Sequence, residues 1–142
     1  METGTLDDSL SLILFSGTDD KLTSASVLVT GAAAMGRRVN VFLQYWGLDA
    51  FRKDRIAKDH GVSAEAGPEG AEAMRRLRER GGTQHWSQNL LMARDVGEVR
   101  ITACALSMEL LEITKDELDP MVDAVEGIAS FMGSVTGPVV FI

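Results

Sequence analysis

The sequence predicts an α/β fold, a three-layer α/β/α Rossmann-like domain with a mainly parallel sheet of about five strands. Short apolar runs of strand length alternate with segments of helical period along the 142 residues. The first two runs flank a helical segment, and a strand–helix–strand unit predicts parallel pairing with a right-handed crossover. No repeat, low-complexity tract or linker divides the chain. We therefore expect a single domain over 1–142.

The N-terminal part predicts a strand that turns into a helix. Residues 9–16 are a compact apolar run, followed by a Ser-Gly-Thr-Asp-Asp turn. Apolar and small residues then recur at helical spacing over 22–36, where a glycine indicates the end of the helix. Thr18 or Asp19 can cap the start of this helix.

The second strand covers 39–43, and the chain after it is predicted to be mostly helical. A short polar-faced segment follows over 49–58. Ala71, Met74 and Leu77 give a narrow apolar stripe on an arginine-rich helix that Gly81-Gly82 ends. A further helical period runs from Trp86 to about Asp95.

The last third predicts two more strands after the one that carries the cysteine. Residues 99–104 are a buried strand, and 106–111 are the helix that follows it. Thr114 and Glu117 have the spacing of a capping box. Val122, Val125 and Ile128 suggest a fourth strand, with a short helix after it. The final strand, 138–142, is so apolar that we expect it to be buried.

Composition narrows the classes of partner. Asp and Glu total 21 against 14 for Lys and Arg, so the net charge is −7. This balance argues against nucleic acid and against an anionic membrane surface as main partners. One cysteine cannot form an internal disulfide, which suits a reducing compartment. With no signal peptide and no apolar run long enough to span a bilayer, we expect a soluble, cytoplasmic protein.

Cys104 is the strongest candidate for chemistry because it stands where a parallel strand ends and a helix begins. Backbone N–H groups and the helix dipole at such a junction favour a thiolate. Ser107, one turn later, could donate its hydroxyl to the sulfur or simply bond the backbone. The alternative for Cys104 is a small, buried hydrophobic residue without chemistry.

Two further segments are predicted to reach the same edge of the sheet as Cys104. They are the turn Ser16-Gly17-Thr18 and the segment Gln44-Tyr45-Trp46-Gly47. In open α/β folds this edge holds the ligand crevice, and glycine lets the backbone approach a ligand. We therefore name Ser16, Gly17, Thr18, Tyr45, Trp46 and Gly47 as binding residues. The alternative is that the turn only redirects the chain and Trp46 plugs the sheet edge.

Other site chemistries find little support in the residues. His60 and His85, the only histidines, have no partner at ligand spacing, so we expect no metal and interpret His60 as solvated and His85 as partly packed. A Cys–His pair stays open, since such partners can be distant in sequence. No Walker loop or dinucleotide fingerprint occurs, so we expect no cofactor. The stretch Arg75–Arg80 is either a solvated face or a docking surface for an acidic partner.

The order of these features resembles the DsrE/DsrF-like family, in particular the single-domain branch labelled DsrE-like or peroxiredoxin-like. The matching pieces are the opening strand with its Ser-Gly-Thr turn, Phe42–Leu48, Thr102–Met108, Gly127–Phe131 and the terminal Val139–Ile142. They span nearly the whole chain. Ala105 follows the cysteine, where this branch commonly has glutamine.

The resemblance implies a Rossmann-like domain that forms homo-oligomers and takes part in intracellular sulfur trafficking. In that role the cysteine corresponding to Cys104 carries a persulfide between donor and acceptor proteins. Our leading hypothesis is therefore a sulfur carrier or sulfurtransferase. A non-catalytic binding or assembly module with a packed cysteine is the alternative. A thiol peroxidase is a third, disfavoured because the chain has no resolving cysteine.

Overall fold

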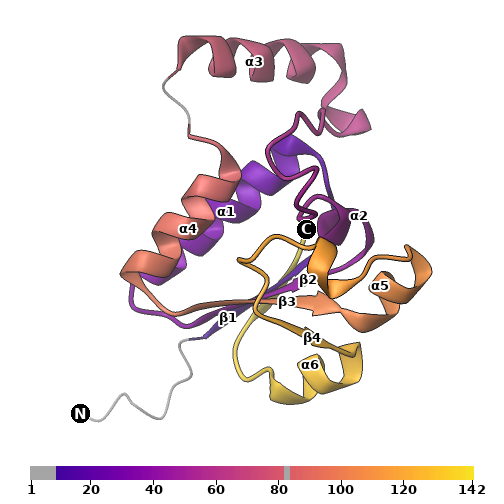
Figure 1. The fold of residues 1–142 in the computed structure, drawn as a ribbon. Helices are drawn as coiled ribbons and strands as arrows, with labels where there is room; N and C mark the ends of the chain where they lie inside the picture. Colours follow the sequence, from indigo (N-terminus) through magenta and orange to yellow (C-terminus); the bar gives the residue numbers. More distant parts are fainter. Residues whose placement is uncertain (1–8, 82–83) are drawn as a thin grey trace.

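The computed structural model describes residues 9–81 and 84–142. Strands and helices alternate along the chain as the sequence predicts (Figure 1). The strands are β1 (Leu10–Leu14), β2 (Val39–Leu43), β3 (Val99–Cys104), β4 (Ala124–Glu126) and β5 (Val139–Phe141). The helices are α1 (Asp19–Ala34), α2 (Tyr45–Asp49), α3 (Gly67–Arg80), α4 (Trp86–Val96), α5 (Ala105–Leu110) and α6 (Ile128–Ser134), with 3₁₀ turns η1 (Ala64–Ala66) and η2 (Lys115–Glu117).

The strands form one parallel sheet in the order β4-β3-β2-β1-β5, which confirms the predicted class of fold. The register is continuous across the centre, where Leu12 pairs with Val41 and Val41 with Ile101. Because every strand is parallel, all carboxyl ends lie at one edge. The order reverses between β1 and β5, and in such sheets that point is where a crevice opens.

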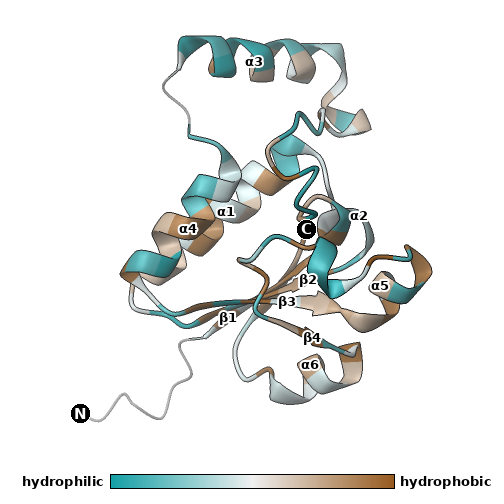
Figure 2. Cartoon of the chain, viewed as in Figure 1, coloured by the Kyte–Doolittle hydropathy of each residue, from teal (hydrophilic) through white to brown (hydrophobic). Residues whose placement is uncertain are grey.

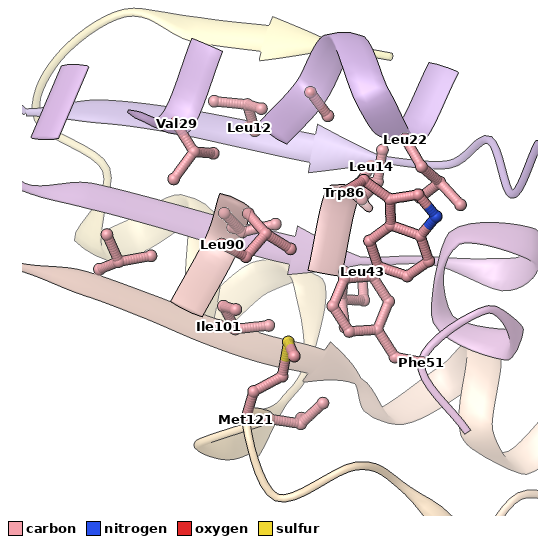
Figure 3. Close-up of a cluster of buried hydrophobic side chains, with 14 of the residues drawn as sticks. Leu12, Leu14, Leu22, Val29, Leu43, Phe51, Trp86, Leu90, Ile101 and Met121 are labelled. Atoms are coloured by element: carbon pink, nitrogen blue, oxygen red, sulfur yellow. The ribbon is translucent and has the colours of Figure 1, made fainter. Parts of the chain in front are cut away.

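One face of the sheet carries the main core. Helices α1 and α4 lie side by side across it (Figure 1). Alternate strand residues such as Leu12 and Ile101 point toward Val29 and Leu90 of these helices (Figure 3). Trp86, at the start of α4, is only 2% exposed and packs its ring against Phe51 at 5.1 Å. This face follows directly from the apolar periodicity of the sequence.

The opposite face has a smaller cluster beneath α6. Phe42 of β2 stacks on Phe131 of α6 with ring centroids 4.5 Å apart, and Cys104 is buried with them. The sheet thus has helices on both sides, as predicted. The two layers are unequal: this face is covered by α6, a helix of seven residues, whereas the other face is covered by the longer helices α1 and α4.

Several predicted elements differ in extent from those observed. The helix after β2 is α2, which ends at Asp49. Residues 50–58 are mostly turns, so the short polar-faced segment predicted over 49–58 is not helical beyond Asp49. Strand β4 includes Val125 but neither Val122 nor Ile128. The predicted capping box at Thr114 and Glu117 is present, but it begins a 3₁₀ turn.

The prediction of a buried C-terminal strand is wrong. Val139 is 40% exposed and Phe141 is 64% exposed, while Val140 packs against the main core. Strand β5 is an edge strand that pairs only with β1, and the side chains of Val139 and Phe141 on one of its faces are exposed. Hydrophobicity alone indicated a strand but not its place in the sheet.

Helix α3 stands apart from the rest of the fold (Figure 1). None of its residues is buried, and its surface is mostly hydrophilic (Figure 2). It ends at Arg80, and its C-cap Gly81 has a φ of 71°, in the left-handed region, as the glycine pair predicts; Gly82 lies outside the described residues. Within residues 9–81 and 84–142, no helix is long and apolar enough to cross a membrane.

Candidate functional site

The turn after β1 and the segment after β2 interlock at the carboxyl edge of the sheet. Gly47 donates its N–H to the Phe15 carbonyl at 2.9 Å, and Gln44 donates to the Leu14 carbonyl at 3.0 Å. Both glycines allow a very close approach. A Cβ on Gly17 would lie 2.3 Å from the Trp46 carbonyl oxygen, and a Cβ on Gly47 would lie 2.2 Å from that of Leu14. The structure thus brings these two predicted segments together.

A cavity of about 350 Å³ opens beside this junction; we call it the edge cavity. Of the predicted binding residues, Ser16, Gly17, Thr18 and Trp46 line it. The rest of its lining comes from Phe15, Lys21, Asp49, Ala50, Arg55, His60, Ser63 and Glu65. Thr18 is the N-cap residue of α1, as expected, although its side chain makes no capping hydrogen bond.

Tyr45 and Gly47 are structural parts of this edge and do not line the edge cavity. Gly47 is buried. Tyr45 has a φ of 43°, a left-handed conformation that costs energy for a residue with a Cβ. Its ring meets Phe15 edge-on, with centroids 5.8 Å apart. This sharp bend turns the chain from β2 directly into α2 and exposes Trp46, which is 55% accessible.

Cys104 is the last residue of β3 and the N-cap of α5, as the sequence predicts. Its Sγ accepts a hydrogen bond from the Ser107 backbone N–H at 3.4 Å. The cysteine is only 3% exposed, because Phe131 and Phe42 cover it. It is not part of the lining of the edge cavity. The alternation of β3 explains this: Ala103 faces the main core, so Cys104 faces the layer under α6.

Ser107 contacts the sulfur through its backbone and not through its hydroxyl. The residue is fully buried, and its Oγ has no hydrogen-bond partner among the described residues. An unpaired buried hydroxyl lowers the free energy of unfolding, and no hydrogen bond of the Ser107 hydroxyl compensates for this loss. At the start of α5, the backbone N–H of Ser107 is the hydrogen-bond donor that contacts the sulfur of Cys104.

Sequence reasoning missed a second polar cluster, built around Asp19. This aspartate is 6% exposed and accepts three hydrogen bonds. They come from the Trp86 indole at 3.1 Å, the His60 backbone N–H at 3.0 Å and the Arg78 guanidinium at 2.5 Å. Asp19 resembles an ordinary first-turn acid in the sequence, and nothing local shows that its partners come from residues 41 to 67 positions away.

The Asp19 cluster borders a second cavity of about 350 Å³, between α3 and the start of α4. Arg78 of α3 crosses this space to reach Asp19 and Asp59. Met74 and Leu77 line the α3 side, so the predicted apolar stripe faces this cavity instead of a packed core. The arginine-rich helix is therefore held to the body by charge pairs.

The rings of both histidines lie near Trp86, whose indole bonds Asp19. The interpretation of His60 as solvated is wrong, because both of its ring nitrogens are buried and lack a partner among the described residues. His85 is partly packed, as expected, and its ring lies 4.9 Å from that of Trp86. The Ser87 N–H donates to its Nδ1 at 3.2 Å, which places the proton of the neutral ring on Nε2.

Burial lowers the pKa of His85 from its ordinary value of 6.5, and the Arg78 charge adds to this effect while Asp19 opposes it. A histidine with a lowered folded-state pKa binds its proton more readily when unfolded. Its contribution to stability is therefore complete above about pH 6.5 and is lost as the pH falls toward the lowered pKa. Between pH 7.5 and 5.5, urea unfolding of the parent chain should lose more free energy than that of His85→Gln. Equal losses would contradict the assignment.

Across the described ranges, no group of three or more His, Cys, Asp or Glu side chains is placed to hold a metal ion.

Comparison with known proteins identifies the family. Residues 7–81 match the DsrE/DsrF/DrsH-like family. The uncharacterised protein YrkE of Bacillus subtilis is 28% identical, in a match covering 86% of this chain and 88% of that protein. The solved structure of MTH1491, a protein of unknown function from Methanobacterium thermoautotrophicum, shares the fold. Its TM-score is 0.52 at 14% identity, over 94% of this chain and 99% of that one. With over half of its sequence matched, the chain belongs to the DsrE/DsrF/DrsH-like family.

Proposed function

We propose that this protein is a sulfur carrier or sulfurtransferase that holds sulfane sulfur as a persulfide on Cys104. The observation that carries the proposal is the cap geometry, in which the only cysteine of the chain accepts the Ser107 N–H at the start of α5. A backbone N–H held at this position stabilises a sulfur anion better than a neutral thiol. Membership in a family linked to sulfur relay supports the same role.

The proposed cycle needs no oxidant and no cofactor. The Cys104 thiolate attacks the outer sulfur of a donor persulfide, the new S–S bond forms, and the donor leaves as a thiolate. Cys104 then carries a persulfide anion. An acceptor thiolate attacks the outer sulfur of this group, and the Cys104 thiolate is released. Because the chain has no second cysteine, both steps use partner molecules, which we propose are donor and acceptor proteins.

Access to the sulfur requires a movement of α6. Cys104 is 3% exposed beneath Phe131, whereas Ile128 and Met132 on the same helix are 39% and 46% exposed. A partner that contacts these apolar side chains could displace α6 and reach the thiolate. Self-association, which the family resemblance implies, would use exposed apolar side chains such as these. The cycle also needs a compartment that keeps Cys104 reduced, such as the cytoplasm.

Intact-protein mass spectrometry tests the proposal. The purified chain is incubated with thiosulfate, or with a persulfidated protein that loads a known sulfur carrier, and is weighed with and without a reductant. We expect a reducible gain of one sulfur in the parent chain and in Ser107→Ala, which keeps the backbone N–H, and none in Cys104→Ser. An adduct that survives Cys104→Ser, or no adduct with an active donor, rejects the proposal.

The alternative, a binding module with an unreactive cysteine, is favoured by the burial of Cys104. Alkylation by iodoacetamide under native conditions separates the two functions. A carrier should react while folded, and Phe131→Leu should accelerate the reaction, because leucine keeps much of the packing but uncovers part of the sulfur. A packed cysteine should react only at the rate of global unfolding, which urea would increase.

A further inference from the structure

We infer that the free side of β5 pairs with the same strand of a second copy of this chain, antiparallel and about a two-fold axis, so that the two sheets join into one. We call this free side the β5 edge; its residues are Val139 and Phe141. Strands β1 and β2 separate it from β3, which ends in Cys104. The inference therefore does not depend on sulfur transfer.

The backbone of the β5 edge has open hydrogen-bonding groups. Strand β1 donates an N–H to the Pro138 carbonyl at 3.0 Å and accepts the Ile142 N–H at 2.9 Å. Because successive residues of a strand point to opposite sides, the N–H and C=O groups of Val139 and Phe141 point away from β1. They have no hydrogen-bond partner among the described residues. Such an edge is a template for another strand.

The side chains of the same two residues are exposed on one face of the sheet. Phe141 pairs in register with Ile13, which packs against the cluster beneath α6. Phe141 therefore lies on the α6 side of the sheet, and so does Val139, two residues earlier. The Phe15 ring stacks on Phe141 at 5.9 Å and holds it in place. An apolar strip thus runs beside the open backbone groups, where a second strand would contact both.

Charge protects the other edge of the sheet but not β5. Strand β4 includes Glu126 and follows Asp123, and charged side chains keep foreign strands from pairing with an edge. Residues 127–142 contain no Asp, Glu, Lys or Arg, although charged residues make up 25% of the chain. Pro138 does not block the β5 edge, because its nitrogen lies on the side of its carbonyl, which bonds β1.

A second copy fits the β5 edge because this edge is complementary to itself. With the two-fold axis at Val140, Val139 of each copy lies opposite Phe141 of the other, and each such pair exchanges both of its N–H···O bonds. The same pairs put a β-branched side chain beside an aromatic one, a favourable cross-strand combination. Copies with a net charge of −7 repel each other, and an uncharged segment adds nothing to this repulsion.

Sedimentation equilibrium in a reducing buffer tests the pairing on the full-length chain. We expect a dimer with a dissociation constant below about 10 µM. Phe141→Lys and Val139→Pro should each raise this constant at least ten-fold, because each change occurs twice in a two-fold interface. Lysine puts a charge on the edge, and proline removes an N–H that β1 does not use. Both variants should keep the circular dichroism of the folded parent chain.

Val27→Lys is the matched control. Val27 is 60% exposed on α1 and Phe141 is 64% exposed on β5, so the two lysine variants make the same change on different surfaces. The control should dimerise as the parent chain does. So should Cys104→Ser, which excludes a disulfide-linked dimer and makes failure of sulfur loading distinguishable from failure of this inference.

Amide hydrogen exchange reports on the open groups directly. At about 100 µM protein, the Val139 amide should exchange at least two-fold more slowly in the parent chain than in Phe141→Lys. The inference is overturned if the parent chain is a monomer at this concentration, which would leave the edge to a strand of another protein, or if its assembly has an odd number of copies. It is also overturned if Val27→Lys dissociates the assembly as Phe141→Lys does, or if the Val139 amide exchanges equally fast in both chains.

Discussion

Gly47→Ala is expected to lower the free energy of unfolding by about 3 kcal/mol, the upper part of the range for overpacking a tight contact. The added Cβ would lie 2.2 Å from the Leu14 carbonyl oxygen and 2.9 Å from its carbonyl carbon. Both are backbone atoms, so no flexible side chain can move aside. The clash would also break the 2.9 Å bond from the Gly47 N–H to Phe15 and so separate α2 from the end of β1.

Gly31→Ala is the matched control. This glycine lies within α1, and a Cβ there would meet nothing within 4 Å. Alanine in a helix interior is more favourable than glycine by about 0.5–1 kcal/mol, so the control should be stabilised. Urea unfolding followed by circular dichroism measures both variants. A Gly47→Ala chain within about 0.5 kcal/mol of the parent would show that this junction is looser than the interlocked turns imply.

The parts of the fold that the sequence predicted well are those set by local pattern. The run 9–16 and the strand 39–43 are buried along nearly their whole length, and the helix between them buries one face, so a continuous apolar run and a helical period were sufficient to predict them. The contact between the turn at Gly17 and the segment at Gly47 was also predictable. Parallel strands deliver their ends to one edge, and two glycines at adjacent ends indicate close backbone approach.

The parts that were missed depend on distant residues. Cys104 was placed correctly at the end of a strand, but its cover is Phe131, which follows a strand that the sequence outlined poorly. The sequence predicts a solvated His60 because no partner lies at ligand spacing from it. Its position comes from a carboxylate 41 residues earlier. The exposure of Phe141 depends on β5 lying at the edge, which composition cannot show.

Asp19→Ala is the second change with a large expected effect, a loss of about 3–5 kcal/mol, because it leaves two buried hydrogen-bond donors unpaired at about 1–3 kcal/mol each. The side chain is 8% exposed. Its loss leaves the Trp86 indole N–H, in a residue that is 2% exposed, and the His60 N–H without an acceptor. Asp19→Asn keeps one oxygen of the right size and should fall between alanine and the parent chain.

Arg78→Gln removes the charge pair but keeps Asp19 as the acceptor of the two buried donors, so it tests the two contributions to stability separately. The Arg78 side chain is 44% exposed, so its pair with Asp19 should contribute no more than about 1 kcal/mol to global stability. Its effect should be local. Because α3 buries none of its own residues and depends on Arg78 for its contacts with Asp19 and Asp59, the variant should speed amide hydrogen exchange in α3 while the sheet stays protected.

Urea unfolding and hydrogen exchange on these variants therefore assign Asp19 its role. If the buried donors dominate, Asp19→Ala is costly throughout the fold and Arg78→Gln affects α3 alone. If Arg78→Gln proves as destabilising as Asp19→Ala, the ion pair carries the energy, and α3 is then an integral layer of the fold and not an arm attached by charge. The first outcome is the one that the burial of Trp86 and the exposure of Arg78 support.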